Sequence, residues 1–187
     1  MARPQGHFIS LEGPDGAGKS TQARLLAKEF RRRGHRVLLT REPGGSRQAV
    51  KIRSLVLKAK GFLSPAAELL LFLADRAQHV NDTIAPAMRL GQTVICDRFT
   101  DSTLAYQGGG RGFRLKELDS LNHFASSGLR PELTLLFDLE ISQGLRRAKK
   151  RGASDRMEKA GAEFHRRVRA AFLVTNAVEA DKLRRII

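Results

Sequence analysis

The chain has 187 residues, of which 41% are hydrophobic and 28% are charged, so it can bury one sizeable core and needs no second domain. A single cysteine, Cys96, excludes a disulfide framework, and nothing resembles a signal peptide or a membrane-spanning run, so we expect a protein of the reducing cytoplasm. The formal net charge of +15 makes nucleic acid a partner to consider.

Short apolar runs alternate with helical patterns along the chain. Strands are expected at Phe8 to Leu11, Arg36 to Thr40, Thr93 to Cys96, Leu133 to Phe137 and Arg185 to Ile187, and helices near 19–34, 46–59, 65–89, 114–127, 140–151 and 157–179. This order predicts an α/β fold, with a parallel five-stranded sheet that carries helices on both faces. Ligands of such sheets bind beyond the carboxyl ends of the strands.

The first predicted strand runs directly into a glycine-rich segment that ends in lysine and serine. The spacing Gly13-x-x-x-x-Gly18-Lys19-Ser20 is the P-loop pattern, in which glycines let backbone N–H groups converge on phosphate oxygens. Lys19 is placed to reach the β- and γ-phosphates, and the Ser20 hydroxyl suits Mg²⁺. The following helix directs its positive end at the same phosphates. This segment therefore predicts a nucleoside triphosphate site.

Three further groups of residues carry chemistry that fits such a site. Arg41 lies in the turn Thr40 to Ser46, where it can bind a phosphate bidentately or remain a solvated surface arginine. Asp97 ends a buried strand, the usual place of the carboxylate that assists Mg²⁺, although an aspartate there can also cap the next helix. Phe72 and Arg76 lie four residues apart on a predicted helix, so they can stack on a base and donate to its edge, or belong to the core.

The basic residues gather in a few segments. Six of them and one acid lie from Arg146 to Arg156, which predicts either a solvated helix end or a cationic lid over transferring phosphates. The clusters at 31–36 and 166–169 resemble helical faces, and no basic run carries interleaved aromatics. With no tryptophan and one tyrosine, Tyr106, base-stacking platforms are not indicated, so nucleic acid is not expected to be the main partner.

Five motifs stand in order along the chain: Glu12-Gly13-Pro14-Asp15-Gly16-Ala17-Gly18-Lys19-Ser20-Thr21, Thr40-Arg41-Glu42-Pro43-Gly44-Gly45, Phe72-x-Ala74-Asp75-Arg76-x-Gln78-His79, Asp97-Arg98-Phe99-x-Asp101-Ser102-x-x-Ala105-Tyr106-Gln107-Gly108 and Asp155-Arg156-Met157-Glu158. Together they resemble the thymidylate kinases over residues 8 to 175. The lid arginines, with a P-loop that has no arginine of its own, are similar to the bacterial type. The resemblance implies one nucleoside monophosphate kinase-like P-loop domain over 1–187, with a short lid at about 146–158.

The resemblance implies a binding site for dTMP as the phosphoryl acceptor. Asp15 would hold the 3′-hydroxyl of the sugar, and Tyr106 would crowd the face where a ribose 2′-hydroxyl would fit. Arg41 and Arg98 would bind the monophosphate, and Arg53 would be a further phosphate contact. Phe72 would stack on the base, and Arg76 would donate a hydrogen bond to its edge. Ser102 and Gln107 would lie near the base.

The resemblance also implies ATP as the phosphoryl donor, with Mg²⁺ assisted by Ser20 and Asp97. Arg147 would pack on the adenine of the donor. The P-loop would bind its phosphates through Gly13, Pro14, Asp15, Gly16, Ala17, Gly18, Lys19, Ser20 and Thr21. The residues implied in catalysis are Asp15, Lys19, Arg98, Arg151 and Arg156, the last two as lid arginines. Lys149 stands where bacterial members often have arginine, which weakens that position as a bidentate clamp.

The activity expected from the resemblance is transfer of the γ-phosphoryl group of ATP to dTMP, giving dTDP and ADP for dTTP biosynthesis. The alternatives are another nucleoside monophosphate kinase, such as a guanylate kinase, and a nucleic-acid-dependent P-loop ATPase. A homodimer is also implied, through the apolar helix around Leu69 to Leu73, although a long buried helix would show the same pattern. The chain stops at Ile187 within the family's last strand, so the C-terminal end of the family fold is expected to be missing.

Overall fold

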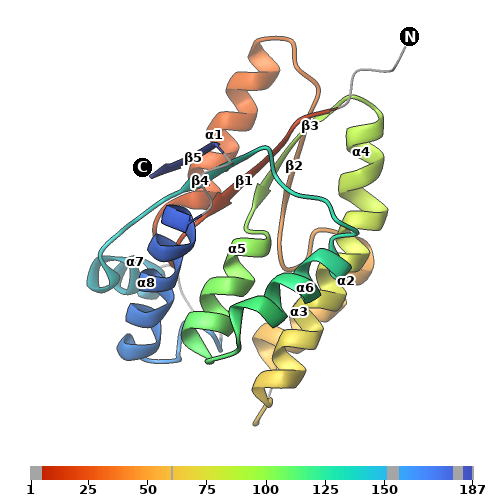
Figure 1. The fold of residues 1–187 in the computed structure, drawn as a ribbon. Coiled ribbons are helices and arrows are strands. Elements are labelled where there is room, and N and C mark those ends of the chain that lie inside the picture. Colours follow the sequence, from red (N-terminus) through yellow and green to blue (C-terminus); the bar gives the residue numbers. More distant parts are fainter. Residues whose placement is uncertain (1–5, 60, 151–155, 179–182, 187) are drawn as a thin grey trace.

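A parallel sheet forms the centre of the molecule. The computed structural model describes residues 6–59, 61–150, 156–178 and 183–186. The strands are β1 (Phe8–Glu12), β2 (Val37–Arg41), β3 (Thr93–Asp97), β4 (Leu133–Leu136) and β5 (Leu183–Ile186), and their order in the sheet is β2-β3-β1-β4-β5. All four neighbouring pairs are parallel, so the predicted five-stranded parallel sheet is confirmed. The strand order puts β1, and the P-loop that follows it, in the middle of the sheet (Figure 1).

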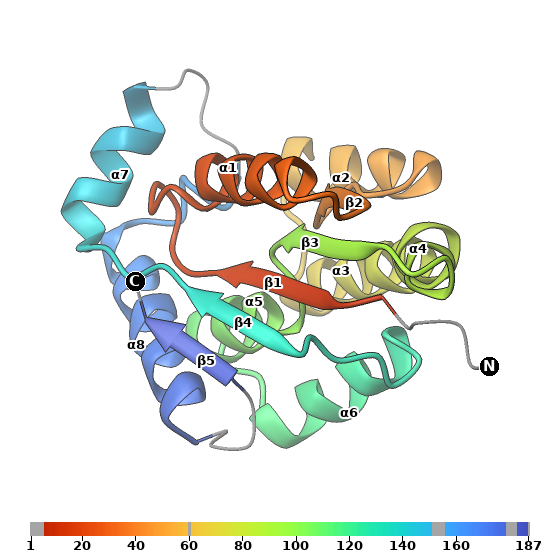
Figure 2. The same cartoon turned by 90° about the horizontal axis from the view of Figure 1, so that it is seen from above.

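Helices cover both faces of the sheet, as the alternation of strands and helices predicted (Figure 2). On one face, α1 (Lys19–Arg32) packs against the strands through a cluster that includes Ile9, Ala23, Ala27 and Ile95. On the other face, α4 (Ala85–Arg89) packs through a cluster that includes Phe8, Ile84, Met88 and Val94. Because neighbouring residues of a strand point to opposite faces, Phe8 and Ile9 contribute to different clusters.

The predicted helix near 65–89 is present as α3 (Pro65–His79), a π-helical turn η1 (Val80–Ile84) and α4. The side chain of Ser64 caps α3 by accepting a hydrogen bond from the N–H of Ala67 at 3.2 Å, and Pro65 takes the first helical position. The helix widens just before Pro86, whose nitrogen has no hydrogen to donate. The preceding helix, α2 (Arg47–Lys58), begins at a serine cap of the same kind.

One helical segment was not predicted. Residues 100–110 form the short helix α5 (Thr100–Thr103) and a π-helical turn η2 (Leu104–Gly110), which ends in three glycines that disfavour a helix. The glycines allow α8 (Ala162–Val178) to pack closely: a Cβ on Gly109 would lie 2.5 Å from the Cβ of Ala171, and one on Gly110 would lie 2.4 Å from the ring of Phe164. Tertiary packing therefore outweighs the low helix propensity of this segment.

The helices α6 (Leu115–Ala125) and α7 (Ile141–Lys150) match their predicted ranges. The last helix begins at Ala162 rather than near 157, because Gly161 adopts a left-handed φ of 88° and the N–H of Arg156 donates to the carbonyl of Leu57 at 3.3 Å. Within the ranges the structure describes, no helix combines the length and the apolar character needed to cross a membrane.

Candidate functional site

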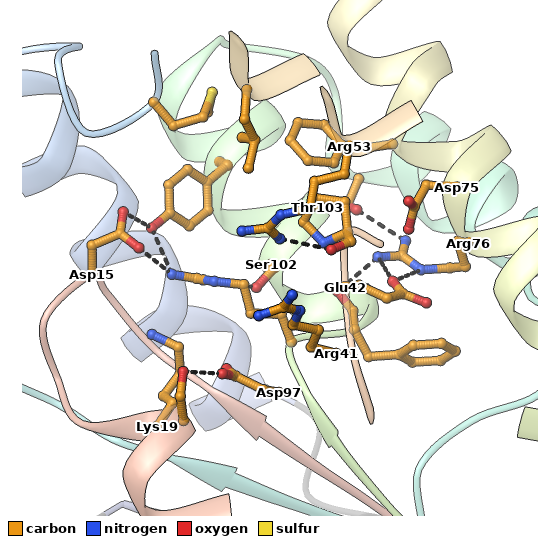
Figure 3. A pocket seen from close by; sticks show the side chains of 18 of the residues that line it. Asp15, Lys19, Arg41, Glu42, Arg53, Asp75, Arg76, Asp97, Ser102 and Thr103 are labelled. Carbon is orange, nitrogen blue, oxygen red and sulfur yellow. Dashed lines mark hydrogen bonds and ion pairs between the residues drawn. The ribbon is translucent and has the colours of Figure 1, made fainter. Parts of the chain in front are cut away.

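A cleft opens at the carboxyl ends of β1, β2 and β3 and holds a cavity of about 260 Å³ (Figure 3). Every residue predicted to bind the acceptor borders it: Asp15, Arg41, Phe72, Arg76, Arg98, Ser102, Tyr106 and Gln107. It is also lined by the residues predicted at the donor phosphates and the metal, including Gly16, Gly18, Lys19, Ser20, Thr21 and Asp97. Residues from five motifs far apart in the chain thus share one cavity.

Glycines shape the P-loop at the start of this cleft. Gly13, Gly16 and Gly18 have φ angles of 133°, 80° and 93°, a region that side chains disfavour. A Cβ on Gly13 would lie 2.2 Å from the carbonyl oxygen of Phe137, and one on Gly16 would lie 2.2 Å from that of Gly144. The loop therefore needs glycine both for its turns and for its approach to the neighbouring backbone.

Lys19 is buried inside the loop that precedes it. Its ammonium group donates to the carbonyl oxygen of Pro14 at 2.7 Å. Burial lowers the pKa of Lys19 to about 8, Arg98 acts in the same direction, and the Asp15 carboxylate opposes them. The ammonium group is still mostly protonated at neutral pH, so it presents a positive charge that phosphate oxygens can satisfy better than one carbonyl.

Ser20 and Asp97 form a pair of oxygen ligands beside Lys19. The hydroxyl of Ser20 donates to Oδ2 of Asp97, whereas Oδ1 of Asp97 is buried and has no hydrogen-bond partner among the described residues. A buried carboxylate oxygen without a partner is costly unless something else contacts it. Hydroxyl and carboxylate oxygens are the ligands that Mg²⁺ takes in proteins, so this pair fits the ion that the P-loop predicts.

Asp15 and Arg98 join the P-loop to the turn after β3. A guanidinium nitrogen of Arg98 lies 2.5 Å from Oδ1 of Asp15, and the Tyr106 hydroxyl donates to Oδ2 of Asp15 at 2.7 Å. Arg98 also donates to Tyr106 at 3.1 Å, to the Ser102 hydroxyl at 3.0 Å and to the carbonyl of Gly13 at 3.1 Å. The structure thus brings together residues that the sequence analysis assigned to sugar and phosphate binding.

The surroundings keep Asp15 and Arg98 charged and Tyr106 uncharged. Burial alone would raise the pKa of Asp15, but Arg98, Lys19 and the Tyr106 hydroxyl outweigh it and lower the pKa to about 2. Burial likewise opposes the charge of Arg98, but its neighbours Tyr106 and Asp15 raise its pKa above the ordinary value. Burial raises the pKa of Tyr106 well above its usual range, so its hydroxyl remains a donor.

Glu12 supports this arrangement from behind and was given no role in the sequence analysis. Its carboxylate accepts from the N–H of Phe99 at 2.7 Å and from the Ser102 hydroxyl at 2.6 Å. Arg98, which directly precedes Phe99 in the turn, has a left-handed φ of 76°, which is unfavourable for a side chain of its size. Burial, followed by the nearby Asp101, raises the pKa of Glu12 to about 7. Its place at the end of β1, just before the P-loop, was the available signal.

Arg76 lies buried at the far end of the cleft. Its guanidinium donates to Glu42 at 2.9 Å, to Thr103 at 2.9 Å, to Asn122 at 2.5 Å and to the carbonyl of Phe99 at 2.8 Å. These bonds fix its position at the cavity wall and occupy much of its donor capacity. The partners Glu42, Thr103 and Asn122 were not predicted, because they are separated from Arg76 by 34, 27 and 46 residues.

Two cations flank the loop after β2: one lies at the end of the strand and lines the cavity, and the other lies on α2 and braces the loop. The side chain of Arg41 is exposed and makes no hydrogen bond or ion pair with the described part of the chain. Arg53 donates to the carbonyl of Pro43 at 2.7 Å, and Asp75 accepts from the N–H of Gly44 at 2.8 Å. Burial, then the neighbouring Glu42, raises the pKa of Asp75 to about 7, and its Oδ2 has no partner among the described residues.

The lid residues are placed only in part. Arg147 is exposed on α7, and Arg151 lies outside the described residues. Arg156 is bound to the buried carboxylate of Glu68 and donates to the carbonyl of Val56 at 3.1 Å, and it does not line the cavity. This position differs from the expectation that Arg156 brings charge to the transferred group, because its guanidinium is used to attach residues 156–160 to α2 and α3.

Comparisons with known proteins agree with this geometry. The thymidylate kinase family model matches residues 11–184. The chain is 52% identical to the thymidylate kinase of Synechococcus sp. (strain JA-2-3B'a(2-13)) over 96% of this chain and 85% of the relative, and 51% identical to that of Pseudomonas fluorescens (strain SBW25) over 95% and 85%. The crystal structure of thymidylate kinase from Ehrlichia chaffeensis superposes with a TM-score of 0.81 at 35% identity, covering 98% of this chain and 93% of that one. The chain belongs to the thymidylate kinase family.

Proposed function

We propose that this chain transfers the γ-phosphoryl group of ATP to dTMP, giving ADP and dTDP for dTTP biosynthesis. The observation that carries the proposal is the ion pair between Asp15 and Arg98, 2.5 Å apart in one cavity. Asp15 belongs to the P-loop, and Arg98 belongs to the segment assigned to the acceptor. Donor and acceptor would therefore meet at this pair. Membership of a family whose curated relatives are named thymidylate kinase supports dTMP as the acceptor.

Each acceptor residue has a role that its place in the cavity supports. Asp15 would accept a hydrogen bond from the 3′-hydroxyl, and Tyr106 beside it would crowd a ribose 2′-hydroxyl. Arg41, which has no described partner, would bind the monophosphate together with Arg98. Phe72 would stack on thymine, and the base would lie near three further residues of the cavity wall, Arg76, Ser102 and Gln107.

The donor side consists of the P-loop, with ATP phosphates on its backbone N–H groups and on Lys19. Ser20 and Asp97 would hold Mg²⁺, which when bound neutralises charge on the donor phosphates. We further propose that 146–158 acts as the lid, with Arg147 packing on adenine and Arg151 approaching the phosphates. Arg156 would anchor the lid to the protein, since it is already paired with Glu68.

The reaction needs no general base. By analogy with phosphorylated side chains, the second pKa of the acceptor phosphate is about 6, so its attacking oxygen is ionised at neutral pH. The protein has to align two polyanions and neutralise charge on a loose, in-line transition state. Lys19 and Arg98 are positioned in the cavity to do this, and the lid cations would complete it.

The test is ADP release with ATP and Mg²⁺ across dTMP, dUMP, GMP, AMP and CMP. We expect a clear preference for dTMP. Preference for GMP would support the guanylate kinase alternative, and turnover stimulated by DNA or RNA would support the nucleic-acid-dependent ATPase. The comparisons favour neither alternative. A profile without preference for dTMP would refute the assignment.

Two separate substitutions, one in the P-loop and one as its control, test the proposed donor site. Lys19→Ala removes the buried ammonium group, and we expect turnover to fall by about 10²-fold or more with the fold intact. Lys28→Ala removes an exposed lysine of the same helix and should leave turnover unchanged. Turnover and thermal melting are measured for both. Near-normal turnover of the Lys19 variant would contradict the proposed donor site.

We also propose a homodimer that functions in the cytoplasm. The exposed face of α3 supports the dimer: Leu70 is 61% exposed, and Ala66, Ala74 and Ala77 are exposed on the same side of the helix. Such an apolar stripe is typical of a face covered by a partner. The lone Cys96, buried and unpaired, is compatible with a reducing compartment.

A further inference from the structure

Glu68, in the first turn of α3, is fully buried, and so far its only role is to pair with Arg156. One carboxylate oxygen accepts from Nε2 of Gln107 at 3.0 Å and from Nε of Arg111 at 3.1 Å. The other accepts from Arg111 at 3.0 Å and from Arg156. Four donors from three side chains therefore converge on one carboxylate behind the acceptor end of the cavity.

The carboxylate of Glu68 is ionised at neutral pH. Burial alone would raise its pKa, but the hydrogen bonds from Arg111, Gln107 and Arg156 outweigh burial and lower it. An ionised carboxylate can only accept hydrogen bonds. A neighbouring amide must therefore turn its NH₂ group, and not its carbonyl oxygen, toward Glu68.

This requirement sets the orientation of Gln107. Its side chain borders the cavity although it is only 1% exposed. Nε2 is used by Glu68, and within the described chain no donor reaches Oε1. The acceptor end of the amide is thus left for a ligand in the cavity.

We propose that Glu68 is a positioning residue for acceptor specificity: it holds the Gln107 amide with Oε1 toward the cavity, which favours a base that offers an N–H there. Thymine carries such a donor at N3, whereas N3 of cytosine is an acceptor. When Oε1 of Gln107 is fixed opposite N3, it accepts a hydrogen bond from thymine. With cytosine, the same oxygen faces the lone pair of N3 and receives no hydrogen bond. This inference rests on the proposed binding of dTMP in the cavity.

The substitution Glu68→Gln tests this directly. Arg111 and Arg156 keep the oxygen of the new amide on their side, so its NH₂ group points at Gln107. Gln107 must then turn its oxygen toward position 68 and its NH₂ group toward the cavity. We expect kcat/KM for dTMP to fall at least about tenfold, mainly through KM, and the dTMP to dCMP ratio to fall with it.

The reciprocal double exchange, Glu68→Gln with Gln107→Glu, separates orientation from loss of structure. The new amide at 68 donates to the new carboxylate at 107, whose second oxygen again faces the cavity as an acceptor. Charge and volume are conserved. We expect the dTMP to dCMP ratio to recover to within about threefold of the unsubstituted chain, which a general loss of packing at Glu68 would not allow.

A further variant, Gln107→Met, keeps the volume and removes the acceptor, so the ratio should fall as it does for Glu68→Gln. Glu163→Gln, in an exposed ion pair with Arg166, is the matched control and should change nothing. Kinetics with dTMP and dCMP, KM for ATP and thermal melting are measured for each variant. An unchanged ratio in Glu68→Gln or Gln107→Met, or no recovery in the double exchange, overturns the inference. A chain that does not prefer dTMP before any substitution overturns the proposed function instead.

Discussion

Three carboxyl groups around the cavity, of which Glu12 and Asp75 are buried and Asp15 is partly buried, differ in the sign of their pKa shift. Asp15 has a lowered pKa of about 2, because Arg98 and Lys19 outweigh its burial. Glu12 and Asp75 have pKa values raised to about 7, because burial dominates and an acidic neighbour adds to it. At single residues, the balance between burial and the neighbouring charges thus decides which carboxyl group stays charged.

Asp75→Asn should change how stability depends on pH. The unfolded chain releases this proton near the ordinary aspartate pKa of 3.8, whereas the folded protein holds it until about pH 7. Between these values the folded state binds more protons, so stability falls as pH rises. Asparagine keeps the oxygen that accepts from Gly44 and removes the titration. We expect the variant to be more stable above pH 7 by about 1 to 3 kcal/mol and to show a flatter decline.

Urea unfolding at pH 5 and pH 8 measures this difference. Asp119→Asn, at an exposed aspartate of α6, serves as the control and should follow the unsubstituted chain at both pH values. If Asp75→Asn also follows the unsubstituted chain, Asp75 does not titrate in the folded protein in the way its surroundings imply.

At the scale of elements, helix packing positions the P-loop. A Cβ on Gly144 of α7 would lie 2.4 Å from the carbonyl oxygen of Asp15, and one on Gly16 would meet the carbonyl of Gly144 at 2.2 Å. The two backbones approach each other because both positions are glycine. Since α7 also begins the proposed lid, its contact with the P-loop links the lid to the donor site.

Gly144→Ala should therefore disturb both stability and ATP binding. The added methyl group has to displace backbone, so we expect a loss of about 1 to 3 kcal/mol in the free energy of unfolding and a higher KM for ATP. KM for dTMP should change less, because α7 does not line the acceptor end. Gln143→Ala, an exposed neighbour on the same helix, is the control. Equal effects of the two variants on KM for ATP would show that the close approach is unimportant.

At the scale of the whole molecule, the proposed dimer depends on the exposed face of α3 being apolar. Leu70→Glu places a charge in the middle of that face, at a side chain that is 61% exposed. We expect the substitution to shift the protein from dimer to monomer in light scattering after size exclusion. Leu90→Glu, at a residue 55% exposed after α4, should leave the dimer intact. A Leu70 variant that remains dimeric would place the interface elsewhere.

The P-loop and the strand ends could be read from the sequence because they depend on local patterns. Glycine spacing, one lysine and an apolar run before them specify the phosphate cradle, and parallel strands put Asp97 and Arg98 at the same edge as Asp15. Asp15, Arg41 and Arg98 border the cavity for this reason, whereas the other acceptor residues reach it from α3 and from the segment 100–110. The roles assigned to these residues stay predictions until the kinetics are measured.

Tertiary structure alone decided the rest. The helical segment 100–110 forms against its glycine content because α8 packs on it, and Arg156 is bound to Glu68, 88 residues away, rather than placed in the cavity. The supporting carboxylates Glu42 and Glu68 have no local signature, since burial and distant partners define them. Short-range sterics and strand direction can be read along a chain, whereas the pairing of a buried charge depends on which residues folding brings beside it.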